Sequence, residues 1–214
     1  MYPFEIHSHT SEHSACSGMT ARELIARCAE LGIAGLVVTD HHYQWPLAEL
    51  QEIAREVAPD GLVVLSAYEV TTVDPRTGRH AGDLLIFGAP EDEPPMQIWT
   101  PYKEACAKAR ELGAMSISAH PFRESMGAGD RVYEMDIDGI EIFNQNHSRI
   151  NVAQARQAVL RRGFLGVAGS DSHSVVQVGQ FCTVFDRPVH TMDEFITELR
   201  ARRYAIQSNR PDIR

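Results

Sequence analysis

Short apolar runs with strand character alternate with segments of helical spacing along this sequence, and no other feature limits the possible folds as strongly. Apolar residues recur at helical spacing over residues 20–32, 46–58, 101–113, 151–163 and 192–203. Between them lie apolar runs typical of buried strands, such as IAGLVVTD at 33–40 and AMSISAHP at 114–121. Repeated strand and helix units predict an α/β fold of parallel strands covered by helices. A closed barrel and an open doubly wound sheet both fit this alternation.

Local signals set some boundaries of these elements. Thr20 followed by Glu23 is the pattern of a capping box, and Gly32 stands where the first helix would end. The run GLVVLSAYEV at 61–70 predicts one strand. The polar stretch TTVDPRTGRHAG at 71–82 contains Pro and Gly, and it predicts an excursion resembling a hairpin.

Length, charge and cysteine content limit the class of protein. The 214 residues contain no repeat or obvious linker, so we expect a single domain over residues 1–214. A formal net charge of −9 at pH 7 disfavours nucleic acid as a partner, except for short oligonucleotide ends. The four cysteines form no C-x-x-C pair, which favours reduced thiols. The sequence shows neither a signal-peptide pattern nor an apolar run of about 18 residues. We therefore expect a cytoplasmic protein with no membrane contact.

Polar side chains that can bind a metal follow most of the predicted strands. These residues are His7, His9, Asp40, His41, His42, Glu69, His80, His120, Asn144, Asp171 and His173. In parallel α/β folds, sites are built at the carboxyl ends of the strands, so these side chains should converge. Imidazole combined with carboxylate suits Zn, Mn or Fe. The set is too large for one ion, so we expect two or three divalent ions, with Glu69 bridging two of them.

Such a cluster of ions would attract phosphate. Neighbouring divalent ions can clamp a phosphoryl group and generate hydroxide near neutral pH. Arg123 and Arg149 each follow a predicted strand end and are candidates for holding the phosphate. His42 and Asn144 are further candidates for contact with the substrate.

The motifs HSHT, TDHH, YE, SAHP and GSDSH, in this order, resemble those of the polymerase and histidinol phosphatase (PHP) family. The resemblance runs from about residue 5 to residue 180. It implies a distorted (β/α)7 TIM-like barrel with a dinuclear or trinuclear metal centre and phosphoesterase activity.

The resemblance also implies roles for individual residues. One ion would be held by His7, His9, Glu69 and Asp171. The second would be held by Glu69, His80 and His120. The third would be held by His41, His173 and a ligand from the loop after His9, for which we expect His13, with Glu12 and Cys16 as alternatives. Asp40 would orient a ligand histidine. The expected catalytic residues are Asp40, Glu69, Asp171 and His173.

We therefore expect a metal-dependent phosphoesterase that uses a metal-bound hydroxide on a phosphate monoester or diester. Its partner would be a small phosphorylated substrate, either a phosphomonoester or a nucleotide. One alternative is a 3′-exonuclease of the same fold that acts on short oligonucleotides. Another is an amidohydrolase-like C–N hydrolase, although no lysine falls at a strand end to supply the carboxylate bridge expected there. A metal-binding module without activity is disfavoured, because nearly all expected ligands are present.

Overall fold

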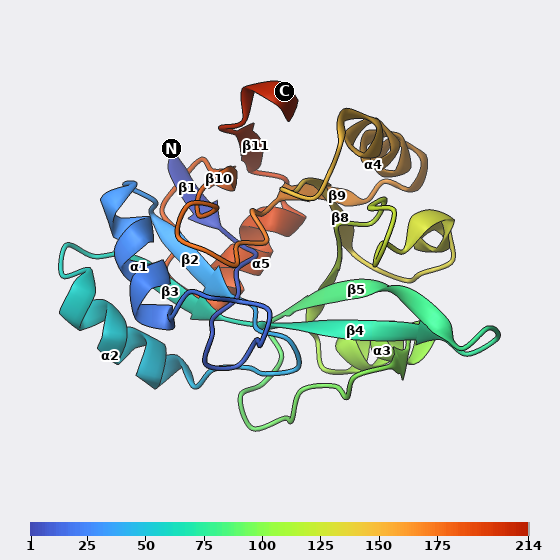
Figure 1. Cartoon of the computed structure of the whole chain (residues 1–214), viewed down its shortest axis with the longest axis horizontal. Helices are drawn as coiled ribbons and strands as arrows, with labels where there is room; N and C mark the ends of the chain where they lie inside the picture. Colours follow the sequence, from blue (N-terminus) through green and yellow to red (C-terminus); the bar gives the residue numbers. More distant parts are fainter. Residues whose placement is uncertain (214) are drawn as a thin grey trace.

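The computed structural model describes residues 1–213 as two mixed β-sheets that are flanked by helices (Figure 1). The α-helices are α1 (Ala21–Glu30), α2 (Leu47–Val57), α3 (Tyr102–Glu111), α4 (Arg149–Arg162) and α5 (Met192–Arg200). The short 3-10 helices are η1 (Gly129–Tyr133) and η2 (Pro211–Ile213). The strands are β1 (Tyr2–Glu5), β2 (Gly35–Val38), β3 (Val63–Ser66), β4 (Tyr68–Asp74), β5 (Arg79–Phe87), β6 (Thr100–Pro101), β7 (Met115–Ala119), β8 (Gly139–Phe143), β9 (Leu165–Ala168), β10 (Phe181–Phe185) and β11 (Tyr204–Ser208).

The helices begin and end within a few residues of the predicted bounds. The predicted capping box of α1 is confirmed, because the Thr20 side chain accepts from the Glu23 amide and the Glu23 carboxylate accepts from the Thr20 amide. Ser148 and Asn151 form the same arrangement at α4, whose last turn ends at Gly163 with a φ of 69°. Since glycine adopts this left-handed conformation without a Cβ clash, Gly163 allows the chain to turn directly into β9.

The strands form two sheets, with the orders β11-β10-β1-β2-β3 and β6-β4-β5-β7-β8-β9. Neighbours are parallel from β1 to β3 and from β7 to β9, whereas β10 and β5 pair with both of their neighbours in the antiparallel sense. The expected α/β class with parallel strands is therefore confirmed. The expected (β/α)7 barrel is not seen as one closed sheet, because isolated parallel bridges, Ser8 to Ser172 and His41 to Glu69, are what connect the two sheets.

The segment 61–70 explains part of this difference. It is not one strand, as predicted, but two: β3 ends the first sheet, and β4 continues after Ala67 in the second sheet. The backbone amide of Ala67 still donates to Val38, so the chain crosses between the sheets without losing that hydrogen bond. The predicted excursion at 71–82 is confirmed as the turn of the β4–β5 hairpin, which projects from the molecule in Figure 1.

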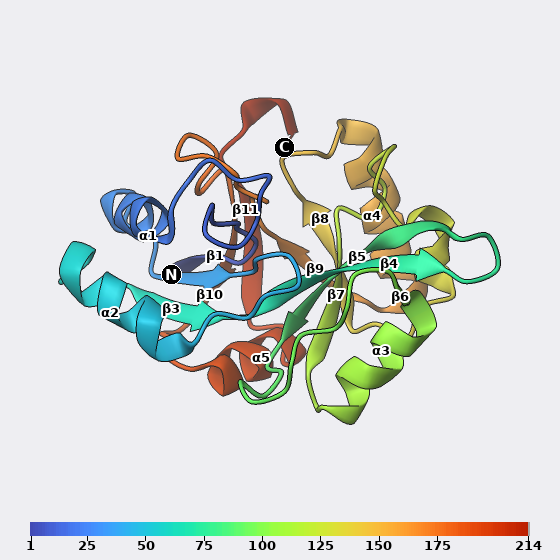
Figure 2. The ribbon, with the colours of Figure 1, turned by 60° about the horizontal axis from the view of Figure 1, so that its bottom comes forward.

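An apolar layer between the two sheets supports the site. Phe4 of the first sheet and Phe87 of the second both pack on Phe195 of α5, with ring centroids 6.1 Å and 5.2 Å apart. Figure 2 shows α1 and α2 beside the first sheet and α3 and α4 beside the second. The apolar side chains of the strands fill this buried layer. The polar residues come where the strands end, so their side chains lie together at the edge formed by these ends.

Within residues 1–213, no helix combines the length and apolar composition needed to cross a bilayer. The assignment of the whole chain to one domain stays a prediction.

Candidate metal centre

Segments far apart in the sequence bring the candidate ligands together. His7 and His9 follow β1, His41 follows β2, and His120 follows β7. The bridge between Ser8 and Ser172 sets the segment after β1 beside the segment after β9, which carries Asp171 and His173. The second bridge directly pairs His41 with Glu69, near the start of β4. The contacts that join the two sheets therefore also assemble the ligands.

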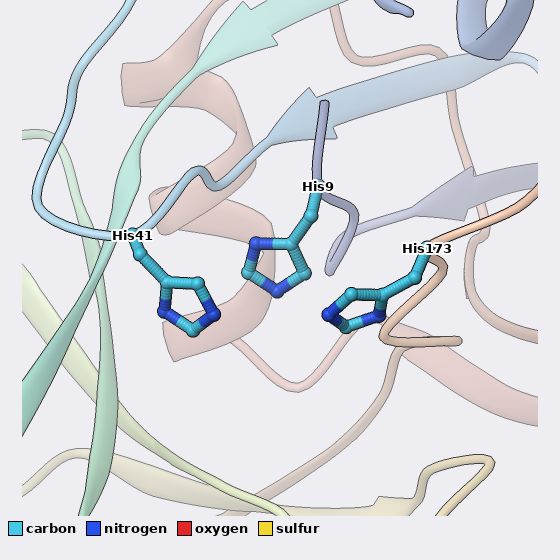
Figure 3. A group of neighbouring side chains, drawn as sticks. All are labelled: His9, His41 and His173. Atoms are coloured by element: carbon cyan, nitrogen blue, oxygen red, sulfur yellow. The ribbon is translucent and has the colours of Figure 1, made fainter. Parts of the chain in front are cut away.

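Three groups of side chains have ligand atoms that all lie within 4.8 Å of one another. The groups are His7 with His9 and Glu69, then Glu69 with Asp83 and His120, and then His9 with His41 and His173. In the third group, a ring nitrogen of each histidine faces the space that the three rings share (Figure 3). Since Glu69 belongs to two groups, it lies where a bridging carboxylate would be needed.

The carboxylate of Glu69 is the centre of this arrangement. Glu69 is fully buried, and neither of its carboxylate oxygens has a hydrogen-bond partner within residues 1–213. Four imidazoles surround it, with nitrogen–oxygen distances of 3.6 Å to His7, 3.3 Å to His9, 3.1 Å to His41 and 3.5 Å to His120. A buried carboxylate without donors is costly unless a cation neutralises it. Unpartnered carboxylate oxygens among imidazole nitrogens therefore fit divalent metal ions.

Asp171 adds a second buried carboxylate. Its Oδ1 lies 3.4 Å from His7 Nε2 and 3.3 Å from His9 Nε2. Its Oδ2 accepts a hydrogen bond of 2.6 Å from the side-chain amide of Asn146. The backbone of Asp171 has a φ of 55°, which is unusual for a residue with a side chain. Asn146 therefore helps to hold Asp171 facing the two histidines.

Glu141 of β8 orients the histidines from behind. The Nδ1 atom of His7 donates to Glu141 Oε1 over 2.9 Å, which leaves His7 Nε2 directed at Glu69 and Asp171. The other Glu141 oxygen accepts from the His120 backbone amide and the Asn144 side chain. A carboxylate behind a ligand histidine fixes its tautomer and its direction. Sequence reasoning missed Glu141, and the available signal was the one charged residue within the apolar run GIEIF.

The electrostatics of the site pair these acids with the histidines. Burial opposes ionisation of His7, but Glu141, Asp171 and Glu69 outweigh it and hold the pKa of His7 well above its usual value. The pKa of His9 is raised to about 9, since the carboxylates of Asp171 and Glu69 outweigh the effect of burial. The pKa values of Glu69 and Asp171 are held below their usual values despite burial, chiefly by His7. The site therefore stabilises positive charge among its carboxylates.

The second ligand group differs from the predicted one at a single residue. Asp83 of β5, and not His80, provides its ligand atom together with Glu69 and His120. His80 lies outside this group and its Nε2 is 3.1 Å from Asp83 Oδ1. The reason is a bulge opposite Thr72 and Val73, which inserts Ala81 into β5 and puts His80 and Asp83 on the same side of the strand. His80 therefore supports a ligand.

The structure does not bring the expected loop ligand into these groups. His13 is exposed and stacks on Tyr43, with ring centroids 3.4 Å apart, and it belongs to none of the ligand groups found in residues 1–213. His9 takes the third place beside His41 and His173. Of the two alternatives, Glu12 caps α1 by accepting from the Ala21 amide, whereas Cys16 lines the cavity beside the ligands.

Asp40 lies behind the ligands and does not line the cavity. Its carboxylate accepts from the Thr10 amide, the Ser14 hydroxyl and the Trp45 indole, so it fixes the loop after His9. The Ser14 oxygen lies 3.4 Å from His9 Nδ1, so Asp40 reaches a ligand histidine only through Ser14. These contacts support a positioning role for Asp40, and its expected catalytic role stays a prediction.

An open cavity of about 360 Å³ lies over the ligands. Its lining includes Cys16, His41, Glu69, Asp83, His120, Arg123, Met126, Gln145, Asn146, Asp171, His173 and Gln177. Arg123 lies where a phosphate-binding residue was expected, and it is the one lysine or arginine in this lining. The other three predicted substrate contacts lie elsewhere: Arg149 is exposed and donates to the backbone of Asp212, Asn144 is buried against Glu141, and His42 faces the carbonyl of Met96.

Comparison with known proteins gives this geometry a context. A family model described as PHP-associated matches residues 150–204. A solved structure of a candidate metal-dependent phosphoesterase from Bifidobacterium adolescentis has a TM-score of 0.67, with 14% identity over 93% of this chain and 96% of that chain. A lesion-specific endonuclease from Pyrococcus furiosus has a TM-score of 0.65 and 16% identity, and the match covers 94% of this chain but 56% of the endonuclease. The PHP-associated match and the fold shared with these structures support membership of the PHP family.

Other similar proteins extend this comparison. An uncharacterized protein of Methanocaldococcus jannaschii is 28% identical over 127 residues, which is 59% of this chain and 67% of that protein. The structure of an amidohydrolase from Chromobacterium violaceum, with bound sulfate and no metal, has a TM-score of 0.67 and 17% identity over 97% of this chain and 98% of that chain. At such identities, the solved structures show that this chain shares their fold. Its chemistry has to be argued from its own site.

Proposed function

We propose that this chain is a metal-dependent phosphoesterase that hydrolyses a small phosphomonoester or a nucleotide at a centre of two or three divalent ions. The observation that carries the proposal is the buried Glu69 carboxylate, whose two oxygens have no donor and face imidazole nitrogens. His7, Glu69 and Asp171 would hold one ion, and Glu69, Asp83 and His120 another. His9, His41 and His173 would hold a third.

Bound ions of this kind would lower the pKa of water and neutralise the oxygens of a phosphoryl group. The chain supplies the remaining functions. The Arg123 guanidinium at the cavity can form two parallel hydrogen bonds with a phosphoryl group. Burial lowers the pKa of His41 and of His173, which keeps both imidazoles neutral and able to bind a cation without first losing a proton.

The Asn146 amide and Glu141 carboxylate keep the ligands in place. Asn146 holds one oxygen of Asp171, and Glu141 holds His7. Both contacts fix side-chain directions before a substrate arrives, which is the kind of preorganisation that catalysis requires. The cavity of about 360 Å³, whose lining also includes Gln145 and Gln177, leaves room for the alcohol part of the ester.

Two alternatives from the same fold receive less support. An amidohydrolase of the type considered above would need a lysine at the metals, and the described cavity lining contains none. An exonuclease would have to bring a polyanion to a chain of net charge −9, so only a short oligonucleotide end fits that reading.

The test is hydrolysis by chelated protein before and after Zn²⁺ or Mn²⁺ is returned. Substrates should include p-nitrophenyl phosphate, mononucleotides, a short oligonucleotide with a labelled 3′ end, and an acylated amino acid for the C–N reaction. We expect phosphomonoester turnover that returns with metal and is lost in Glu69→Gln, while the exposed control Glu52→Gln remains active. Full activity after exhaustive chelation would reject the proposal, and turnover of the acylated amino acid alone would favour the amidohydrolase reading.

A further inference from the structure

The two ends of the metal centre carry chemically different ligands. The group of His9, His41 and His173 offers three nitrogen atoms. The group of Glu69, Asp83 and His120 offers two carboxylate oxygens and one nitrogen. The difference comes from Asp83, because a histidine at this place would have made the second group rich in nitrogen as well.

The backbone and the side chain of Asp83 are both held in place. It lies in β5 with a strand on each side, paired with Thr71 of β4 and with Ala119 of β7. The residue is 2% exposed. Its Oδ1 accepts from His80, which leaves Oδ2 facing His120 Nε2 at 3.9 Å. The ring of His80 packs in turn against Trp99, with centroids 5.9 Å apart. The carboxylate therefore reaches the centre from a rigid strand with one oxygen already occupied.

The group of His9, His41 and His173 offers imidazole nitrogen atoms and no carboxylate oxygen. The ring of His9 lies 4.4 Å from that of His41 and 4.6 Å from that of His173. The Nδ1 atom of His173 donates to the Asp171 carbonyl over 2.9 Å, so its other nitrogen is the one free for an ion. Cys16 lines the same cavity beside these imidazoles and adds a soft sulfur to the surroundings. Figure 3 shows the three rings around one shared space, reached from three separate segments of chain.

Ligand type biases the choice of ion. Imidazole suits Zn²⁺, whereas carboxylate suits harder ions such as Mn²⁺. Any site with nitrogen and oxygen ligands binds Zn²⁺ more tightly than Mn²⁺ in absolute terms. The expected difference between the groups is therefore in the ratio of the two affinities, and it is visible only when free Zn²⁺ is scarce and Mn²⁺ abundant.

We propose that this chain is a mixed-metal protein in which the imidazole group of His9, His41 and His173 takes Zn²⁺ and the acidic group of Glu69, Asp83 and His120 takes Mn²⁺. The inference rests on the proposed function only in assuming that both groups bind ions. It assigns the choice of ion to Asp83, a residue of the acidic group alone.

The experiment is a competition for the two ions. Metal-free protein is equilibrated with excess Mn²⁺ while chelator-buffered Zn²⁺ is raised in steps. Zn and Mn per chain are measured in solution, Mn²⁺ is followed by electron paramagnetic resonance, and anomalous diffraction at the zinc edge locates the zinc. We expect a range of Zn²⁺ concentration in which zinc occupies the imidazole group while manganese stays at the acidic group.

Variants at residue 83 test whether Asp83 determines which ion the acidic group binds. In Asp83→His, Zn²⁺ should displace the manganese at a concentration lower by about tenfold or more, the scale on which even groups behind a ligand change metal affinity. Asp83→Asn, which keeps the size and removes the charge, should lose manganese without gaining zinc. The control Asp136→His makes the same change at an exposed acid outside the centre and should titrate like the unaltered protein.

Two results would overturn the inference: zinc entering both groups of the unaltered protein at one concentration, or Asp83→His releasing manganese at the unaltered concentration. The first needs no variant, so a misfolded variant does not leave the inference untested. Failure of the proposed function looks different. A protein that partitions the ions as expected and yet hydrolyses no phosphoester would retain this inference and reject the phosphoesterase.

Discussion

The Nδ1 atom of His7 lies 2.9 Å from Oε1 of Glu141, and both side chains are fully buried. The contact spans 134 residues of sequence and joins the segment after β1 to β8 of the other sheet. It directs the second nitrogen of His7 at the carboxylates of Glu69 and Asp171. One hydrogen bond therefore connects the packing of the two sheets to the geometry of the metal centre.

Glu141→Gln should weaken metal binding. Glu141 accepts hydrogen bonds from three N–H donors. In Glu141→Gln, the side-chain NH2 group would face at least one of these donors, and that hydrogen bond would be lost. We expect metal affinity to fall by roughly 10–100-fold, measured by titration calorimetry on metal-free protein. Glu111→Gln, at an exposed position of α3, serves as the control, and equal affinities for the two variants would contradict this role of Glu141.

Arg123→Gln should weaken substrate binding and leave the metals in place. A hydrogen bond to a charged group is worth about 1.5–3 kcal/mol. The KM for a phosphomonoester should therefore rise by roughly 10–100-fold, with the metal content per chain unchanged. Arg149→Gln is the matched control, because Arg149 is exposed and bonds to the Asp212 backbone. A similar rise in KM for both variants would show that the effect is one of overall charge.

His173→Ala and His13→Ala compare an expected ligand that lies in a ligand group with an expected ligand that lies outside all of them. His173 shares a ligand group with His9 and His41, while His13 packs on Tyr43 at the surface. Metal analysis of the loaded proteins should show at least one ion fewer in His173→Ala and an unchanged content in His13→Ala. Loss of an ion from His13→Ala would restore the expectation that this loop supplies a ligand.

Stability in acid should depend on Glu198. Hydrogen bonds from Arg203, and then from Arg187, lower the pKa of this α5 carboxylate to about 2, below its ordinary value of 4.5. A pKa lowered by folding stabilises the fold above the unfolded value, and this contribution is lost as the pH falls from about 4.5 toward 2. The free energy of unfolding should therefore fall less over this range in Glu198→Gln than in the unaltered protein.

Urea unfolding at several pH values measures this difference. Glu52→Gln, at an exposed position of α2, should retain the full dependence on pH. Parallel curves for the Glu198 variant and the unaltered protein would show that the ion pairs of Glu198 do not contribute to the acid sensitivity.

The candidate ligands that follow strands could be predicted from the sequence. His7, His41, His120 and Asp171 each stand shortly after a short apolar run, and this pattern can be recognised within one segment. Asp83 could not be predicted in this way. A bulge at Ala81 depends on how β5 pairs with β4, and pairing leaves no trace in the periodicity of one strand. The antiparallel pairing of β5 with β7, and of β10 with both of its neighbours, was missed for the same reason.

Buried supporting residues were harder still to recognise. Glu141 and Asn146 act only through contacts with residues distant in sequence, His7 and Asp171. Glu141 is flanked by Ile140 and Ile142, and nothing within the segment itself distinguishes an acid that faces a histidine from one that faces solvent. His13 lies outside the ligand groups found in residues 1–213, and its contacts with Tyr43 and Trp45 are not encoded in the local sequence.

The central claim is that Glu69 is a metal ligand shared between ions, and anomalous diffraction from crystals of metal-loaded protein tests it most directly. We expect at least two separate anomalous peaks near the carboxylate of Glu69, each about 2.0–2.2 Å from one of its oxygens if the ion is zinc. One of these peaks should also contact Asp83 and His120. Peaks confined to other parts of the molecule, or loaded crystals in which Glu69 contacts only protonated histidines and water, would contradict the account.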